Sequence, residues 1–527
     1  MPQLSQFGSL NTTALVVPDV YVQIVPPQVL ALNGVPSNVI GYVGTAIWGP
    51  VNQPQVIGGM AGYTTAFGKY TTRKFDLGTH VAIAVQQGAS SFRCVRVTDG
   101  TDLPAEATLV AGGDAASWLS AAAAVNTGNS ALRGPSLIVV FSPTATGGIV
   151  VARYTGSAGN EILLTTSPGT RAGTAKISVT MPNQADETYD NLPFVSLPTF
   201  TSVILQGGTD GATPAAGTAS GVSAATLIGA DGFVRSGLYA LRGQKCGIGV
   251  LCDGDDSTQW TTTDAFGVAE GVYMVHTGPS GDTIENAIAV KKAAGLDSPW
   301  SKLMFGDWIY WDDPVNKQIR VVSPAAFLAG EFGNLSPEQS SLNKRLGSVV
   351  GSQRGGQPGT GQIGGYATAE LEALFEVGID IITNPIPGGD YWGARLGHNS
   401  SSDATRSGDN YTRMTNYLSA TILGGMGKYI GAVINNDLFR RIRSTLNNFL
   451  NALLGQGILA LDDHGNSPYL VVCDVSNNPQ ARTSLGYVQA DVTVTYQGIN
   501  EKFLVNLQGG ATVLTQQSNG RTFSLAA

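Results

Sequence analysis

The alternation of apolar and polar positions predicts an α/β domain near the start of the chain. Two apolar runs flank a Gly/Pro-rich turn in residues 39–59 (VIGYVGTAIWGPVNQPQVIGG), and residues 79–87 (THVAIAVQQ) have the pattern of a helix. A further apolar run follows at residues 92–97 (FRCVRV). A strand, a helix and a strand in this order are typical of an α/β unit.

The pattern changes between residues 98 and 230. This stretch is rich in Ala, Gly, Thr and Ser and has short alternating runs, which predict strands at 136–141, 149–154 and 175–181. The α/β pattern then returns. We therefore expect an inserted β-rich domain, residues 98–230, that splits one α/β domain into residues 26–97 and 231–350. In the second part, strands are predicted at residues 246–252 and 272–276, and helices at residues 264–270 and 283–294.

A linker and a third domain are predicted in the C-terminal part. Residues 351–365 (GSQRGGQPGTGQIGG) have the composition of a linker. Beyond it, residues 366–507 are expected to form an α+β domain, and residues 508–527 a C-terminal arm. The clearest helix pattern of this α+β domain covers residues 437–454, with Asn436 as the N-cap and Gly455 as the residue that ends the helix. Strands are predicted at residues 469–475, 486–496 and 502–507.

Both ends of the chain are predicted to be extended and apolar on alternate positions. Residues 15–25 (LVVPDVYVQIV) are β-rich, but Pro18 makes them a poor central strand. Segments of this kind are suited to pair with the sheet edge of another subunit through main-chain hydrogen bonds. The candidate residues for this strand addition are Val16, Val17, Val20, Tyr21, Val22, Ile24, Phe503, Leu504, Val505 and Leu507.

The composition favours a protein whose surface packs against other subunits. The chain has 527 residues, only 13% of them charged, with 68 glycines and a net charge of −8. This charged share is roughly half the usual value, so dispersed charge does not cover the surface in the ordinary way. The acidic balance also argues against nucleic acid as a direct partner.

The sequence predicts neither export nor a membrane span. The N-terminus lacks the basic start and apolar core of a signal peptide, and residues 421–434 are too short to cross a bilayer and include Lys428. The cysteines have no metal-ligand spacing, which favours buried free thiols over a redox role. They are Cys94, Cys246, Cys252 and Cys473.

No motif in the sequence predicts a catalytic, cofactor or metal site. The glycines of one GxGxxG, residues 359–364, follow no strand, which favours a linker over a dinucleotide loop. His276 lies close in sequence to Ser280 and Asp282, but neighbours in a turn do not by themselves make a triad, so a capped turn is favoured. A hydrolase that uses the α/β domain is kept as the alternative from another functional class.

Three arginines lie in the first half of the helix at residues 437–454: Arg440, Arg441 and Arg443. Such a cluster is usually a solvated face. Because the three cations have one sign and the other side of the helix is apolar, the cluster is also a candidate docking surface for an acidic partner.

Several segments, taken in order, resemble the contractile tail sheath proteins of phages and related contractile injection devices. Three residues depart from the family pattern: Asp19 replaces the usual Gly, Thr155 the usual Pro and Phe439 the usual Trp. The similar segments are residues 18–22 (PDVYV), 42–46 (YVGTA), 48–54 (WGPVNQP), 86–97 (QQGASSFRCVRV), 154–160 (YTGSAGN), 410–418, 437–457, 473–478 (CDVSNN) and 500–504 (NEKFL).

The resemblance implies a non-enzymatic structural subunit of a virion. It would form stacked helical rings of identical copies around an inner tail tube and contract to drive that tube through a cell envelope. The implied split domain has a subtilisin-like shape, the inserted domain is outermost, and the α+β domain faces the tube and holds an N-terminal β arm, residues 1–25. The arginine cluster is then the candidate for tube docking.

Further partners implied by the resemblance are the baseplate and tail terminator proteins, with assembly in the host cytoplasm. The sequence leaves open whether the device is a bacteriophage tail, used in genome ejection, or a sheath of another contractile injection system.

Overall fold

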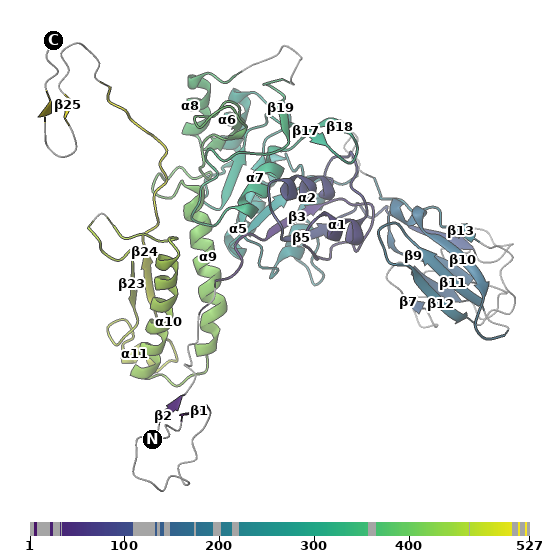
Figure 1. The fold of residues 1–527 in the computed structure, drawn as a ribbon, viewed down its shortest axis with the longest axis horizontal. Helices are drawn as coiled ribbons and strands as arrows, with labels where there is room; N and C mark the ends of the chain where they lie inside the picture. The colour runs from purple at the N-terminus through teal and green to yellow at the C-terminus, as the bar shows by residue number, and fades with distance from the viewer. Residues whose placement is uncertain are drawn as a thin grey trace, which may run out of the picture.

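The computed structural model shows three bodies along the chain (Figure 1). A central α/β body lies between a β-rich body on one side and a helix-containing C-terminal body on the other. The structure describes residues 5–7, 22–24, 32, 34–108, 132–133, 137–141, 148–172, 175–192, 202–212, 221–356, 365–462, 464–507, 515–516 and 522–523.

A seven-stranded sheet forms the centre of the α/β body. Its strand order is β20-β16-β15-β14-β3-β5-β4, and every neighbouring pair is parallel except β4 with β5. The parallel order with intervening helices agrees with the α/β fold expected from the sequence. The strands are β3 (Ile40–Gly44), β4 (Gln55–Ile57), β5 (Phe92–Arg96), β14 (Ile248–Leu251), β15 (Tyr273–Thr277), β16 (Ser301–Met304) and β20 (Ile379–Asp380).

Helices cover both faces of this sheet because successive strand residues point to opposite sides. On one face, α1 (Met60–Phe67), α2 (Leu77–Gln86) and α7 (Pro324–Asn334) pack on Tyr42 and its neighbours. On the other face lie α4 (Ala224–Ile228), α5 (Trp260–Glu270), α6 (Ile284–Ala294) and α8 (Thr368–Glu376). A smaller sheet, in the order β18-β17-β19, comprises β17 (Ile309–Asp313), β18 (Gln318–Val322) and β19 (Val349–Ser352).

The structure corrects the predicted start of the C-terminal domain at residue 366. Strand β20 completes the central sheet, and Leu374 of α8 packs with Trp260 and Leu303. The segment that follows, with β21 (Ile382–Thr383) and β22 (Gly393–Ala394), packs on the same body. The glycine-rich stretch is typical of a linker by composition, but the chain beyond it returns to the same sheet.

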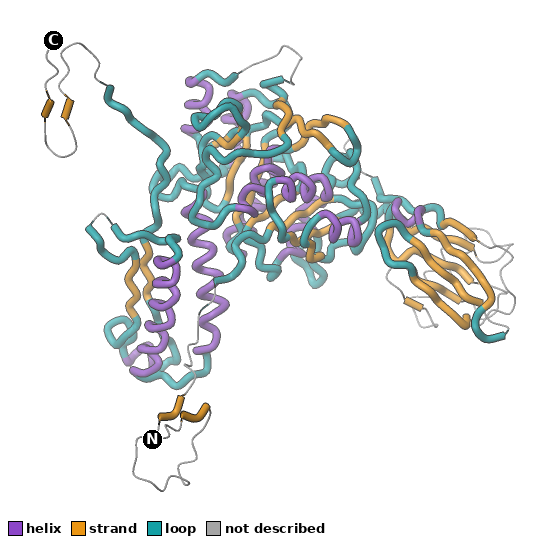
Figure 2. Tube along the Cα trace, in the orientation of Figure 1, coloured by secondary structure: helices purple, strands orange, loops and turns teal. Residues whose placement is uncertain are grey.

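The β-rich body is formed by the segment predicted as an insertion. Figure 2 shows strands throughout it. Two four-stranded sheets have the orders β6-β9-β8-β7 and β12-β11-β10-β13. Ile47 and Trp48 of the α/β body join its core, while Leu227 of α4 packs under the central sheet. The strands are β6 (Pro104–Thr108), β7 (Leu132–Arg133), β8 (Leu137–Phe141), β9 (Gly148–Thr155), β10 (Leu163–Pro168), β11 (Ala175–Thr180), β12 (Glu187–Leu192) and β13 (Ser202–Ile204).

Two long helices and a two-stranded sheet form the C-terminal body. Helix α9 (Asp409–Met426) runs from the α/β body into it, beside α10 (Asn436–Gly455) (Figure 1). The N-cap of α10 is Asn435, one residue before the predicted Asn436, because its side chain accepts from the Leu438 N–H. The other elements are β23 (Tyr469–Val472), α11 (Gln480–Thr483) and β24 (Asp491–Val494).

The ends of the chain form short pairs of their own. Strand β1 (Ser5–Phe7) pairs with β2 (Val22–Ile24), and β25 (Thr515–Gln516) pairs with β26 (Thr522–Phe523). The strand predicted at residues 502–507 is not formed, because the backbone there has no strand partner in the described part of the chain.

The four cysteines are buried and free, as the sequence predicts. Burial raises the pKa of the Cys246 thiol to about 12. Among the described residues, no helix combines the length and apolarity needed to cross a membrane.

The apolar face of α10 should determine the stability of the C-terminal body. Leu446 is 1% exposed in that core, whereas Leu423 on α9 is 81% exposed. We expect Leu446→Ala to lower the free energy of unfolding by about 2–5 kcal/mol through lost burial and a cavity. Leu423→Ala is the matched control and should leave it nearly unchanged. Denaturant unfolding of both variants tests this, and equal midpoints would contradict it.

Candidate assembly interface

The two-stranded sheet of the C-terminal body presents open edges. Strands β23 and β24 pair only with each other in the described residues. One face of the sheet packs on α10 through Val471 and Val492, whereas Leu470 on the other face is 62% exposed. Unpaired N–H and C=O groups along such an edge are a template for a further strand. The sheet is therefore a candidate acceptor for strand addition.

The candidate donor near the C-terminus is exposed. The Phe503, Leu504, Val505 and Leu507 side chains are 84%, 84%, 65% and 89% exposed. Four exposed apolar side chains in one short segment form a patch of the kind that marks an interaction surface.

The candidate donor near the N-terminus is described only in part. Val22 and Ile24 lie in β2, whose backbone pairs with β1. Val16, Val17, Val20 and Tyr21 lie outside the described residues.

The arginine cluster lies on the exposed side of α10, and each member has an acidic neighbour. Arg440 and Arg441 both pair with Asp437, at 3.4 and 3.1 Å, and Arg443 lies 3.8 Å from Asp474. Their side chains are 71%, 55% and 42% exposed. Three cations against two carboxylates leave a small excess of positive charge, and exposed pairs of this kind contribute little to stability.

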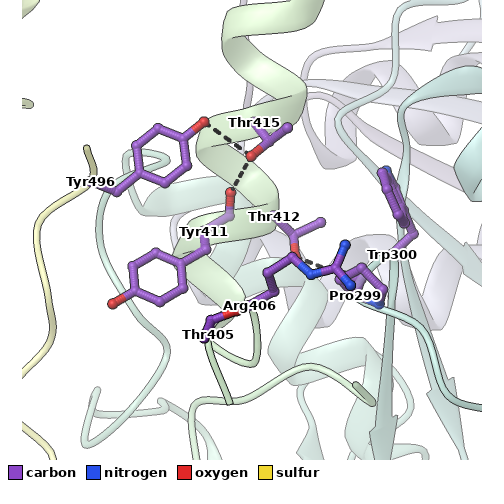
Figure 3. A pocket seen from close by; sticks show the side chains of 8 residues that line it. All are labelled: Pro299, Trp300, Thr405, Arg406, Tyr411, Thr412, Thr415 and Tyr496. Carbon is purple, nitrogen blue, oxygen red and sulfur yellow. Dashed lines mark hydrogen bonds between the residues drawn. The ribbon is translucent and has the colours of Figure 1, made fainter. Parts of the chain in front are cut away.

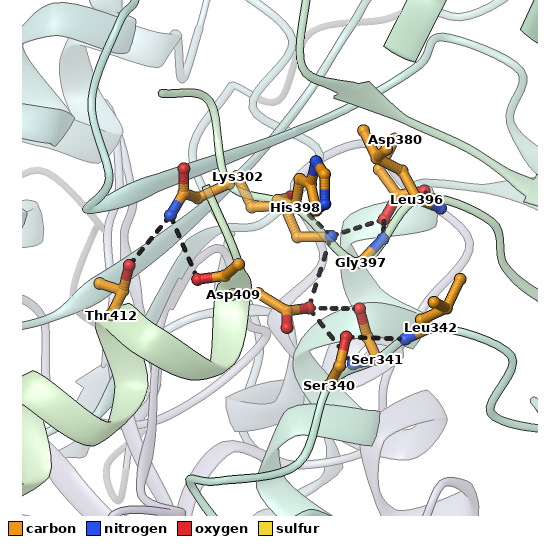
Figure 4. Close-up of polar contacts among 12 residues, drawn as sticks. Lys302, Ser340, Ser341, Leu342, Asp380, Leu396, Gly397, His398, Asp409 and Thr412 are labelled. Carbon is orange, nitrogen blue, oxygen red and sulfur yellow. Dashed lines mark hydrogen bonds and ion pairs between the residues drawn. The ribbon is translucent and has the colours of Figure 1, made fainter. Parts of the chain in front are cut away.

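A buried ion cluster joins the start of α9 to the α/β body (Figure 4). The Lys302 ammonium lies 2.5 Å from an Asp380 carboxylate oxygen and 3.7 Å from one of Asp409, and all three side chains are fully buried. It also donates to the His398 carbonyl at 3.0 Å. The cluster therefore brings together strand β16, the end of β20 and the first residue of α9.

Backbone groups complete the cluster. Asp380 accepts hydrogen bonds from the N–H groups of residues 381 and 395–397, and Asp409 accepts from Ser341 N and Oγ. Burial raises the pKa of Asp380, but Lys302 and these N–H groups outweigh burial, so the pKa lies below its usual value. Its contribution to stability is thus present above the unfolded pKa, about 3.9, and is lost as pH falls through the lower folded pKa.

Arg413 fixes α9 one turn further on. This buried guanidinium donates to the carbonyls of Phe332 and Leu335 at 2.9 and 2.7 Å, and to those of Ser336 and Gln339 at 3.2 Å. These carbonyls lie at and just after the C-terminal end of α7, where a cation is favourable. The α7 end and the α9 start are therefore held together.

The residues considered for hydrolysis do not converge. His276 is buried, with Nε2 3.2 Å from Ser301 Oγ and Nδ1 3.5 Å from Thr263 Oγ1. Burial lowers its pKa to about 3, so the ring is neutral near pH 7. Ser280 Oγ instead donates to Gln353 Oε1. A Ser-His-Asp arrangement of His276, Ser280 and Asp282 is therefore not formed.

The structure tests the remaining candidate motifs only in part. The glycines at 359–364 lie outside the described residues. Among the residues that the structure describes, no three His, Cys, Asp or Glu side chains gather as a metal ion requires.

Several solved structures of contractile sheath proteins share this fold. The PVC sheath of an extracellular contractile injection system, in the contracted state, matches with a TM-score of 0.54 and 13% identity over 95% of this chain and 99% of that chain. The helical sheath of the anti-feeding prophage, also in the contracted state, matches with a TM-score of 0.52 and 11% identity over 94% of this chain and 100% of that chain. The sheath tail protein of Desulfitobacterium hafniense matches with a TM-score of 0.52 and 14% identity over 86% of this chain and 93% of that chain.

These matches confirm the resemblance at the level of the fold: the chain has the multidomain α/β fold of contractile sheath proteins. No family model matches the chain, and no curated protein matches its sequence.

Removing the central cation of the buried cluster should destabilise the contact between α9 and the α/β body. We expect Lys302→Met to lower the free energy of unfolding by about 3–5 kcal/mol, because Asp380 and Asp409 are then buried without their counter-ion. Lys69→Met is the matched control, since that side chain is 61% exposed in a surface pair with Glu161. Denaturant unfolding at pH 7 measures both, and a loss below 1 kcal/mol for Lys302→Met would show that the cluster is not essential.

Proposed function

We propose that this chain is the structural subunit of a contractile tail sheath and a member of the tail sheath protein family. Its copies assemble as stacked helical rings around an inner tail tube and contract to drive the tube through a target cell envelope. The proposal is supported by the shared fold, which covers nearly the whole of both chains in the PVC and anti-feeding prophage matches. The role requires no catalysis.

The observation that carries the proposal is the coexistence of an open acceptor and an unpaired donor in one chain. The β23–β24 sheet has unpaired edges, and residues 503–507 carry exposed apolar side chains without a strand partner in the described residues. In the proposed polymer, residues 16–24 and 503–507 of one copy add as strands to the sheet edges of its neighbours. Main-chain hydrogen bonds then link the copies.

Contraction is proposed to occur between two packings of this linked lattice. The terminal strands keep copies joined while the larger bodies rotate and form new lateral contacts. The extended lattice is the less stable packing, and the difference in free energy between the two drives the tube.

The proposed layers follow the three bodies. The C-terminal body faces the tube, the α/β body with its proposed subtilisin-like shape lies outside it, and the β-rich body is outermost. The other proposed partners are the tube protein, the baseplate and the tail terminator, with assembly in the host cytoplasm. The proposal covers a phage virion or another contractile device, which a DNA-filled head on purified particles would distinguish.

Electron microscopy of the purified full-length protein tests the proposed function. Hollow rods with regular striations are the expected result at high protein concentration. A folded protein that stays monomeric at every concentration and salt condition, with or without its tube protein, would contradict the proposal.

Deleting residues 1–25 should block polymerisation without unfolding the chain. The described bodies retain their cores, so the circular dichroism spectrum and unfolding midpoint should match those of the full-length protein. Sedimentation and electron microscopy should detect monomers only. Rods of normal length from this variant would exclude the N-terminal segment as a link between copies.

Charge reversal on α10 should weaken tube docking. We expect the triple variant Arg440→Glu, Arg441→Glu, Arg443→Glu to form rods alone but to lose co-sedimentation with tubes by about tenfold, because like charges repel at an acidic surface. The matched control is Lys69→Glu, Lys245→Glu, Lys317→Glu, three exposed positions in loops outside the C-terminal body. Equal tube binding by the two variants would show that the three arginines are not part of the docking surface.

A further inference from the structure

The chain that leads from β24 to the exposed C-terminal donor segment is attached to α9 at Tyr496 (Figure 3). The Tyr496 ring stacks on Tyr411 with ring centroids 6.2 Å apart, and its hydroxyl lies 3.0 Å from Thr415 Oγ1. Both partners lie in the first two turns of α9. The two tyrosine rings also line a cavity of about 440 Å³, together with Trp300. The start of the arm is therefore fixed against α9 by an aromatic contact and a hydrogen bond.

Hydrogen bonds continue this attachment at the next residue. The Gln497 carbonyl accepts from Asn410 Nδ2 at 3.3 Å, and its side-chain Nε2 donates to the Gly457 carbonyl at 2.8 Å. Asn410 belongs to α9, and Gly457 follows the end of α10. The arm is thus bonded at Gln497 to the start of one long helix and to the end of the other.

The last polar attachment of the arm is an ion pair with the α/β body. Glu501 Oε1 lies 2.8 Å from His398 Nε2, and the two side chains are 41% and 22% exposed. Beyond it, residues 502–507 are exposed and form no hydrogen bond or ion pair within the described part of the chain. Glu501 therefore marks the boundary between the attached and the free part of the arm.

The backbone that carries His398 is itself held on both sides. The His398 carbonyl accepts from the buried Lys302 ammonium at 3.0 Å (Figure 4), and His398 forms a β-bridge with Gly408. The next residue, Asn399, donates its N–H to the Ser407 carbonyl at 2.7 Å. The imidazole that receives Glu501 is thus presented from a backbone bonded to the buried ion cluster.

The position of this pair limits the freedom of the donor segment without covering it. With the pair formed, only Lys502 separates the attachment from Phe503, whose side chain is 84% exposed. Without it, the preceding hydrogen-bonded attachment is at Gln497, and residues 498–502 separate it from the donor segment. A shorter free stretch has fewer conformations to lose when the donor segment becomes ordered on a partner.

We propose that the His398–Glu501 pair positions the C-terminal donor segment for strand addition to a second copy. The inference rests on the proposed sheath function and deepens it, because it assigns the direction of the arm to two residues outside both the donor segment and the acceptor sheet. The pair acts through the donor segment and does not itself contact the second copy.

Limited trypsin digestion of the full-length chain, at a concentration below that at which rods form, tests the attachment. Lys502 is an exposed cleavage site next to the pair, and proteolysis follows the population of locally detached chains. His398→Ala leaves the sequence around this site unchanged. It should raise the rate at which peptides beginning at Phe503 appear by about threefold or more, with an unchanged unfolding midpoint, because a partly exposed pair contributes little to global stability.

His464→Ala is the matched control, since His464 is exposed in the loop before β23 and should leave the cleavage rate at the wild-type value. Mass spectrometry measures the rate in each variant. Equal rates of cleavage after Lys502 in His398→Ala and the wild type would overturn the proposal.

Exchange of the two side chains tests the positioning role in assembly. His398→Glu places two carboxylates together and should raise the critical concentration for rod assembly by about threefold or more, because the arm is then detached. The double variant His398→Glu, Glu501→His restores a pair with its ends exchanged and should return the critical concentration close to the wild-type value. A role of His398 in folding alone would not be rescued in this way, so failure of the double variant to recover would overturn the proposal.

The outcomes separate this inference from the proposed function. Rods that form at the same critical concentration in His398→Glu and the wild type would overturn the positioning role and leave the sheath proposal intact. If the wild-type protein forms no rods, the sheath proposal fails and the positioning role fails with it, whereas the digestion experiment still measures the attachment of the arm.

Discussion

The burial of one positive charge, on Lys302, controls how the α/β body and the C-terminal body meet. An ammonium group loses its hydration inside a protein, and only paired carboxylates and carbonyls compensate for that loss. Here the compensation comes from Asp380 at the end of the last strand, from Asp409 at the start of α9 and from the His398 carbonyl. Strand β20, the loop after it and the first turn of α9 are all needed to enclose the Lys302 ammonium group.

The direction of α9 follows from this enclosure. Its first turn is fixed by Asp409 and its second by Arg413, which also contacts the Phe332 ring at 5.0 Å. The middle of α9 supports the C-terminal body through Met414 and Leu418, which lie in the same core as α10. The open sheet edges are therefore connected to the α/β body through a helix whose first two turns make buried polar contacts with it.

Features with a local signal could be predicted from the sequence. The amphipathic pattern of α10, the apolar strands of the central sheet and the β-rich insertion depend on neighbouring residues, so periodicity was sufficient to find them. The N-cap differs by one residue because Asn435 and Asn436 are equally suitable by residue type. The segment at 502–507 has the composition of a strand but forms none, because a strand also needs a partner.

Features that depend on distant residues could not be predicted. Lys302 stands out as a lone cation in an apolar stretch, but its partner Asp380 is 78 positions away. The return of the chain to the central sheet after the glycine-rich stretch could not be predicted either, because β20 pairs with β16, which is also far away in sequence. Only the folded chain shows these neighbours.

The open β23–β24 edge has a consequence for the direction of growth. A polymer in which each copy gives one segment and receives another has two unlike termini, one with vacant edges and one with unused segments. In the proposed sheath the two termini would therefore expose different groups, so that elongation and capping would differ between them. The polarity of the proposed filament would thus follow from the open edges of one two-stranded sheet.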